Sequence, residues 1–315
     1  MKALIHSGDK QVAWVDVQAP VQQDGDDIVD VLVAGICGTD LGAVRSGRPP
    51  IPVGMVLGHE FVGRRHSDGQ LVVGNPILSC GCCRSCREGR ANLCERRQVL
   101  GVHRAGAFSE SIAVPATNLK SARSLDPTRA AMVEPIATAL HAWRISPMPR
   151  DNIGIIGSGP IGLSVLHVVK ALGLSGVTVT DIAPERLAHA RACGADATAE
   201  RLSGMFDVIV DSVGTNETRR DAVELIRAGG TAILVGLHAP ELAVPGGLVV
   251  AAEKTIRGSF AYTPAEFDEA IELAADLDTS WIATVPFASS AEAFMSLLTG
   301  AGDPGQVKIH LHIAN

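Results

Sequence analysis

The sequence is poor in aromatic residues, carries no excess of basic residues, and does not begin with an apolar segment. Aromatic side chains make up 3% of its 315 residues, and the formal net charge is −7. An acidic chain without a basic or aromatic stripe lacks the surface that binds nucleic acid or an anionic membrane. The first ten residues, MKALIHSGDK, lack the apolar core of a secretory signal, so we expect a cytoplasmic protein.

Internal repeats, low-complexity tracts and long blocks of like charge are also lacking. A hydrophobic content of 46% with 19% charged residues is typical of a folded, enzyme-like protein, and the length favours two domains. The apolar stretch 153–179 is not a membrane helix, because His167 and Lys170 interrupt it and its glycines fit a nucleotide-binding turn better. We therefore predict neither a nucleic-acid nor a membrane partner.

Residues 153–182 have the pattern of a dinucleotide-binding unit. Apolar runs at 153–156 and 177–180 predict buried strands, and 163–172 has the period of a helix. The turn between the first strand and the helix reads G-x-G-x-x-G, where the glycines permit a tight turn, close approach of a pyrophosphate, and close helix packing. An ordinary glycine-rich turn is the alternative. The predicted nucleotide contacts are Gly157, Gly159, Pro160, Ile161 and Gly162.

The end of the second strand supplies the expected cofactor preference. Asp181 is placed to accept the ribose hydroxyls of NAD and to repel the additional phosphate of NADP. Arg186, further along, is expected to cover the adenine. Helical patterns at 185–193 and 217–227 alternate with strand patterns at 207–210 and 231–235, which indicates a doubly wound parallel sheet.

Five of the seven cysteines fall within fifteen residues. The spacing C-x2-C-x2-C-x7-C can close a tetrahedron of thiolates around zinc, and four protein ligands make such a site structural. Cys82 is a spare cysteine that could shift the register, and unligated thiols are the alternative interpretation. The predicted ligands are Cys80, Cys83, Cys86 and Cys94.

These motifs occur in the order of a known family. The chain resembles the zinc-dependent medium-chain dehydrogenases, most closely the sorbitol or polyol dehydrogenase branch. The resemblance rests on the nucleotide loop, the four-cysteine segment, and the segments 35–40, 58–60, 134–135, 211–214 and 258–260. It implies an α/β fold in which a doubly wound (Rossmann) domain, 136–261, is inserted into a GroES-like β-rich catalytic domain, 1–135 plus 262–315. It also implies an active site in the cleft between these domains.

The same resemblance implies a second, catalytic zinc. Its ligands would be Cys37 and His59, with Glu60 and Glu134 as the carboxylate candidates; Glu60 is the commoner ligand in this branch, and Glu134 would lie on the metal-bound water. By themselves, a lone cysteine and histidine are more simply a buried thiol and a structural imidazole. Thr39 matches the hydroxyl that relays the substrate proton, although it could instead cap a helix.

Two departures from the family concern the proton path and the cleft. Gly42 replaces a histidine that often passes the proton to solvent, which leaves water, the cofactor ribose, His103 or His141 for this step. The segment between Gly63 and Cys80 is shortened. The expected reaction is polarisation of a secondary hydroxyl by the metal, with transfer of a hydride from the carbinol carbon to NAD. Because Glu134 stands where the other main branch of the family has a cysteine, the resemblance implies a polyol, sugar acid or cyclitol as the substrate.

Alternatives remain for the substrate and for catalysis itself. The motifs are compatible with 1,2-diol or threonine-like substrates, and a non-catalytic nucleotide-binding sensor or scaffold could retain the same fold. Relatives assemble through an edge strand of the nucleotide-binding sheet, so we expect a homodimer or homotetramer. The apolar segments Thr231–Val235 and Leu242–Val250 are the candidate surfaces for this contact.

Overall fold

The computed structural model describes residues 1–146 and 151–314. The chain forms two compact units, one made of Met1–Glu134 with Thr263–Asn315 and the other of Pro135–Tyr262. Both ends of the chain therefore belong to the first unit, and the second unit is an insertion. None of the helices within the described residues is both long enough and apolar enough to cross a membrane.

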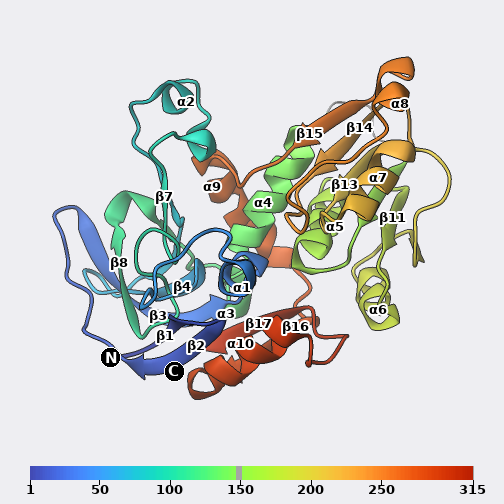
Figure 1. Cartoon of the computed structure of the whole chain (residues 1–315). Helices are drawn as coiled ribbons and strands as arrows, with labels where there is room; N and C mark the ends of the chain where they lie inside the picture. The colour runs from blue at the N-terminus through green and yellow to red at the C-terminus, as the bar shows by residue number, and fades with distance from the viewer. Residues whose placement is uncertain (147–150, 315) are drawn as a thin grey trace. The chain divides into compact units, whose positions relative to one another are not determined.

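The first unit is built on a largely antiparallel sheet. Its strand order within the described residues is β16 (Ile282–Pro286), β17 (Lys308–His312), β3 (Asp26–Gly35), β4 (Glu60–Arg65), β5 (Leu71–Gly74) and β9 (Leu119–Ser121), and β8 (Ser111–Pro115) also pairs with β3. Alternating buried residues along β3 supply the core face of this sheet. The pairing of β17 with β3 brings the last strand beside the third, as the red and blue ribbons show (Figure 1).

The remaining elements of this unit are short. The strands are β1 (Lys2–Gly8), β2 (Gln11–Asp16), β6 (Ile77–Leu78) and β7 (Gln98–Val99); the helices are α1 (Gly38–Ser46), α2 (Arg84–Arg87), α3 (Pro127–Ala130), α9 (Pro264–Leu273) and α10 (Ser290–Thr299). Helix α4 (Val133–Arg144) begins in this unit and continues into the second. Pro135 lies in the first turn of α4, where a missing backbone N–H costs no helical hydrogen bond, so the Glu-Pro pair marks a helix start.

The second unit contains a parallel sheet. Its order is β12 (Ala197–Ala199), β11 (Val177–Thr180), β10 (Ile153–Ile156), β13 (Phe206–Asp211), β14 (Ile226–Leu234) and β15 (Thr255–Gly258) within the described residues. Helices α5 (Pro160–Ala171), α6 (Pro184–Ala192) and α7 (Asn216–Glu224) connect successive strands, and α8 (Gly246–Ala251) precedes β15. The strand order reverses on either side of β10, and ligands of such sheets bind where this reversal occurs.

Two expectations about this unit were wrong. The helix predicted over 217–227 ends at Glu224, and β14 begins at Ile226, because the buried Ile226 pairs with Phe206 of β13. The segment Thr231–Val235 is not an exposed contact surface, since β14 is flanked by β13 and β15 and Thr231, Ala232 and Ile233 are buried. In the other candidate segment, Leu242, Leu248 and Val250 are exposed.

Candidate functional site

A cluster of metal-ligand side chains forms where β3, α1 and β4 meet. Gly35 at the end of β3 pairs with Glu60 at the start of β4, and this register brings Cys37 close to His59 and Glu60. One donor atom from each of these three side chains lies within 4.8 Å of the others. Thiolate, imidazole and carboxylate are the donors that catalytic zinc sites use, and three protein ligands leave one coordination position open. The donor set therefore fits a catalytic zinc.

Asp40 supports this cluster from the first turn of α1. Its carboxylate is fully buried and accepts hydrogen bonds from the backbone N–H of Cys37 (3.0 Å) and of Gly58 (3.3 Å). Its Oδ1 also lies 3.5 Å from Nδ1 of His59. Burial acts to lower the pKa of His59, but the charges of Asp40 and Cys37 outweigh it and raise that pKa well above its usual value. Asp40 thus holds the loop of Cys37 by a hydrogen bond and lies at ion-pair distance from the ring of His59.

The structure places a buried lysine against the same cluster. Nζ of Lys308, on β17, forms an ion pair with Glu60 and donates a hydrogen bond to the carbonyl of Ile36 (2.9 Å). Both Lys308 and Glu60 are 1% exposed. Neither Asp40 nor Lys308 was assigned a role from the sequence. A signal for Asp40 was its position in the first turn of a helix after Cys37, whereas Lys308 comes from a segment 248 residues from Glu60.

The other two predicted catalytic residues, Thr39 and Glu134, lie in the first turns of helices α1 and α4. Thr39 is the second residue of α1 and is half-buried; Cys37 occupies the capping position, so Thr39 is not the helix cap. Glu134 lies in the first turn of α4, and its charge contributes to raising the pKa of Lys308. Among the described residues, the group of donor atoms within 4.8 Å of one another contains Glu60 and not Glu134.

His103, one of the candidates for passing the proton to solvent, has a local contact. Its Nδ1 accepts a hydrogen bond from the backbone N–H of Val99 (3.1 Å), which gives His103 a local structural role.

The four predicted structural ligands are brought together by α2 and the turns around it. Sulfur atoms of Cys80, Cys83, Cys86 and Cys94 lie within 4.8 Å of one another. Cys82 is exposed and outside this group, and its sulfur lies 2.7 Å from Nη2 of Arg96. The backbone N–H of Cys82 is the largest influence that lowers the pKa of Cys80, which favours the thiolate needed by a metal. The sulfur set fits a closed, structural zinc site.

The glycine loop has the geometry that nucleotide binding requires. Gly157 has a φ of +93°, and an added Cβ would lie 2.6 Å from Cγ2 of Val213. A Cβ on Gly162 would collide with the carbonyl of Gly157, which explains the close packing of α5 on the loop. Gly159, which precedes Pro160 and Ile161 of α5, faces open space. The backbone at Gly159 is therefore accessible to a pyrophosphate at the helix N-terminus.

Asp181 follows β11 and is held by the same loop. Its Oδ2 accepts hydrogen bonds from the backbone N–H (2.9 Å) and the hydroxyl (3.1 Å) of Ser158, and its Oδ1 accepts the N–H of Ala183 (3.0 Å). Ser158 is fully buried. Its role was not apparent from the sequence, in which it occupies a variable position of the glycine motif. Arg186 is the third residue of α6 and is half-buried.

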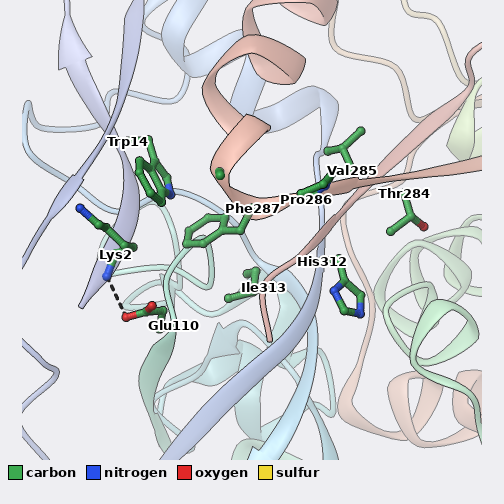
Figure 2. Close-up of a pocket in the computed structure, with 10 residues that line it drawn as sticks. Lys2, Trp14, Glu110, Thr284, Val285, Pro286, Phe287, His312 and Ile313 are labelled. Carbon is green, nitrogen blue, oxygen red and sulfur yellow. Dashed lines mark hydrogen bonds between the residues drawn. The ribbon is translucent and has the colours of Figure 1, made fainter. Parts of the chain in front are cut away.

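A surface pocket of about 590 Å³ lies elsewhere in the first unit. In Figure 2 the aromatic rings of Trp14 and Phe287 lie on one side of it and His312 and Thr284 on the other. Lys2 donates its backbone N–H to Glu110 at the edge (2.8 Å). None of the residues that line this pocket belongs to the predicted metal or nucleotide sites, so it is distinct from the candidate active site.

Known families match both parts of the chain. Residues 23–123 match the alcohol dehydrogenase GroES-like domain, and residues 160–276 match the zinc-binding dehydrogenases. The L-galactonate-5-dehydrogenase of Escherichia coli K12 is 32% identical over 321 residues, with 93% of this chain and 94% of that protein covered. An L-threonine 3-dehydrogenase of Streptomyces coelicolor is 36% identical over 288 residues, covering 82% of this chain and 84% of the relative.

A solved structure agrees with these sequence matches. An alcohol dehydrogenase of E. coli CFT073 in complex with NADH is 27% identical, covers 99% of each chain and has a TM-score of 0.91. The chain therefore belongs to the family of zinc-dependent medium-chain dehydrogenases. The predicted fold class, a Rossmann domain inserted into a GroES-like domain, is confirmed. Zinc and a nicotinamide dinucleotide are the cofactors of this family, and the four-cysteine cluster is consistent with a structural zinc.

Proposed function

We propose that the protein oxidises a secondary hydroxyl of a sugar acid, or of a related polyol or cyclitol, with NAD as the hydride acceptor. The observation that carries the proposal is the cluster of the half-buried Cys37 with the buried His59 and Glu60, whose donor atoms lie within 4.8 Å of one another. The L-galactonate dehydrogenase that matches almost the entire chain favours a sugar acid within the wider class of secondary alcohols.

Each residue of the cluster has a definite task in this reaction. Cys37, His59 and Glu60 hold the zinc, which supplies a Lewis acid for the substrate hydroxyl, while the bound NAD supplies the hydride acceptor. Asp40 fixes the orientation of His59 and the loop of Cys37. The hydroxyl of Thr39 accepts the alcohol proton and at the same time passes its own proton to the next acceptor. With Gly42 at the relay position, water or the cofactor ribose carries this proton onward.

The preference for NAD rests on Asp181. A carboxylate held at the end of β11 accepts ribose hydroxyls and repels a 2′-phosphate, and the neighbouring Ile182 offers no compensating cation. Gly157, Gly159 and Gly162 position the pyrophosphate, and Arg186 covers the adenine. Reduced cysteines in a metal cluster suit a cytoplasmic protein, and a homodimer or homotetramer remains our prediction for its assembly.

A threonine-like or 1,2-diol substrate is the second candidate, and the 36% identity to an L-threonine 3-dehydrogenase favours it. A screen of sugar acids, polyols, cyclitols, 1,2-diols and L-threonine, with NADH absorbance as the readout and NADP in parallel, separates the candidates. Turnover of a sugar acid or polyol with NAD is the expected result. No turnover on any secondary alcohol by zinc-loaded protein would establish the non-catalytic alternative instead.

A further inference from the structure

A buried positive charge is built into the candidate catalytic metal site. Lys308 of β17 reaches Glu60, and its side chain is 1% exposed. Burial opposes this charge, and the ion pair with Glu60 together with the hydrogen bond to the carbonyl of Ile36 compensates for the lost water. Glu60, the side chain that pairs with the ammonium, is itself a candidate zinc ligand. The positive charge of Lys308 therefore lies beside a carboxylate that a zinc ion would also bind.

The backbone around this ion pair is shaped to contain it. A Cβ added to Gly35 would collide with Oε2 of Glu60 and would lie 2.9 Å from Cε of Lys308. The carbonyl of Ile36 accepts a second hydrogen bond from Nζ, at 2.9 Å. Gly35 thus leaves room for the ion pair, and the carbonyl of Ile36 accepts a further hydrogen bond from the ammonium. Such a pair is costly to bury and is strongly destabilising when one partner is removed.

We propose that Lys308 is an internal counter-cation of the catalytic metal site. Without metal, it neutralises the carboxylate of Glu60 and keeps the site folded; with metal, it competes with zinc for that carboxylate. Two cations that share one carboxylate repel each other, so each weakens the binding of the other by the same factor. The inference rests on the proposed zinc-dependent function, because it concerns the affinity of that zinc.

The test is the zinc affinity of Lys308→Met, measured by competition with a chromogenic chelator. The Cys37→Ser variant should lack the catalytic zinc, so the zinc that the unmodified protein releases and Cys37→Ser does not is the zinc of the catalytic site. We expect Lys308→Met to bind this zinc about tenfold more tightly than the unmodified protein, because a competing charge is absent. Lys308→Arg keeps the charge and should remain within about threefold of the unmodified protein.

A thermodynamic cycle with Glu60→Gln isolates the competition. In the Glu60→Gln background there is no carboxylate to share and only direct repulsion between the two cations remains, so adding Lys308→Met should raise zinc affinity by a smaller factor than it does with Glu60 present. Melting curves give a second readout: zinc should raise the melting temperature of Lys308→Met more than that of the unmodified protein. Circular dichroism follows folding. If Lys308→Met folds only when zinc is added, zinc replaces the lysine charge beside Glu60, as the inference requires.

Other outcomes overturn the inference. Zinc affinity that is unchanged or weaker in Lys308→Met would show that the lysine is a structural or ligand-supporting residue. Failure of Lys308→Met to fold even with zinc, while the Glu60→Gln/Lys308→Met double variant folds, would show that zinc does not replace the lysine charge. If the unmodified protein holds one zinc and Cys37→Ser holds the same amount, the proposed catalytic zinc fails together with the inference.

Discussion

The carboxylate of Asp181 accepts two hydrogen bonds from Ser158, one from its backbone N–H and one from its hydroxyl. Both reach the same oxygen, Oδ2, while Oδ1 is held by the N–H of Ala183. The residue proposed to choose between NAD and NADP is therefore fixed by the glycine loop that is proposed to bind the pyrophosphate. The two proposed tasks, phosphate binding and ribose selection, would therefore depend on one segment, in which the hydroxyl of Ser158 is bonded to Asp181.

Replacement of Ser158 by alanine tests this connection. Ser158→Ala removes the 3.1 Å hydroxyl contact but keeps the backbone contact, so Asp181 becomes less firmly oriented. A hydrogen bond to a charged group contributes about 1.5 kcal/mol, so we expect the Kd for NAD to rise roughly tenfold. The Kd for NADP should change less, which narrows the preference for NAD. Fluorescence titration with both reduced nucleotides measures the two constants.

Ser164→Ala is the matched control. Ser164 is also fully buried and lies on α5, and among the described residues its hydroxyl has no hydrogen-bond partner. Its removal should leave the affinity for both nucleotides unchanged. Equal weakening of NAD and NADP in Ser158→Ala would instead indicate that the serine supports the loop as a whole and has no share in selecting the cofactor.

The parallel sheet could be predicted from the sequence because its strands are continuous apolar runs. The strands β10, β11 and β13 are short and largely buried, and in the helices between them apolar residues recur with the helical period. The local pattern was therefore sufficient to predict which segments are strands and which are helices. The strands β4, β5 and β16 were not predicted. β16 ends in proline and pairs with β17 across a long sequence separation, and such pairings leave little local signal.

The candidate site shows the same division. Cys37, His59 and Glu60 were identified because a family pattern marks them, and the register of β3 with β4 brings them together. Lys308 could not be found in this way. Its position is set by the pairing of β17 with β3, so only the folded chain shows that a lysine near the end faces Glu60. Contacts of this kind depend on topology, which spacing in the sequence does not encode.

The choice of cysteines in the structural site can be decided by metal content. Cys94 is fully buried within the four-sulfur group, whereas Cys82 is exposed and pairs with Arg96. Cys94→Ser should lose one zinc per chain and lower the melting temperature by roughly 10 °C or more, because a structural zinc contributes directly to folding. Elemental analysis and calorimetry measure the two effects.

Cys82→Ser is the companion variant for this experiment. It should retain both zinc ions and melt within about 2 °C of the unmodified protein, since an exposed side chain outside the cluster contributes little. Loss of zinc from Cys82→Ser, with zinc retained in Cys80→Ser, would shift the ligation register by two residues and would contradict the geometry of the sulfur group.

We expect His310 to make the stability of the first unit depend on pH. It lies on β17, two residues after Lys308 and on the same face, and neither ring nitrogen has a hydrogen-bond partner among the described residues. Burial, followed by the charge of Lys308, lowers its pKa to about 3, while Asp126 acts in the opposite direction. The folded chain therefore holds a neutral imidazole that would be protonated in the unfolded chain at mildly acidic pH.

The sign of the effect follows from proton binding. Between the unfolded pKa of about 6.5 and the folded value, the unfolded state binds the additional proton, so stability falls as the pH falls through this window. At pH 5 the loss amounts to about 2 kcal/mol. His310→Leu, which is close in volume, should abolish this loss, so that the variant gains about 2 kcal/mol relative to the unmodified protein between pH 7 and pH 5.

Urea denaturation at pH 5, 6 and 7 measures the difference, and acid effects common to both proteins, such as weakening of the zinc sites, cancel in the comparison. His312→Leu is the control, because it removes an exposed imidazole from the same strand. It should lose stability on acidification in parallel with the unmodified protein. If His310→Leu also follows the unmodified protein, then the buried imidazole finds a partner or a proton in the folded state, and the acid sensitivity of the chain originates elsewhere.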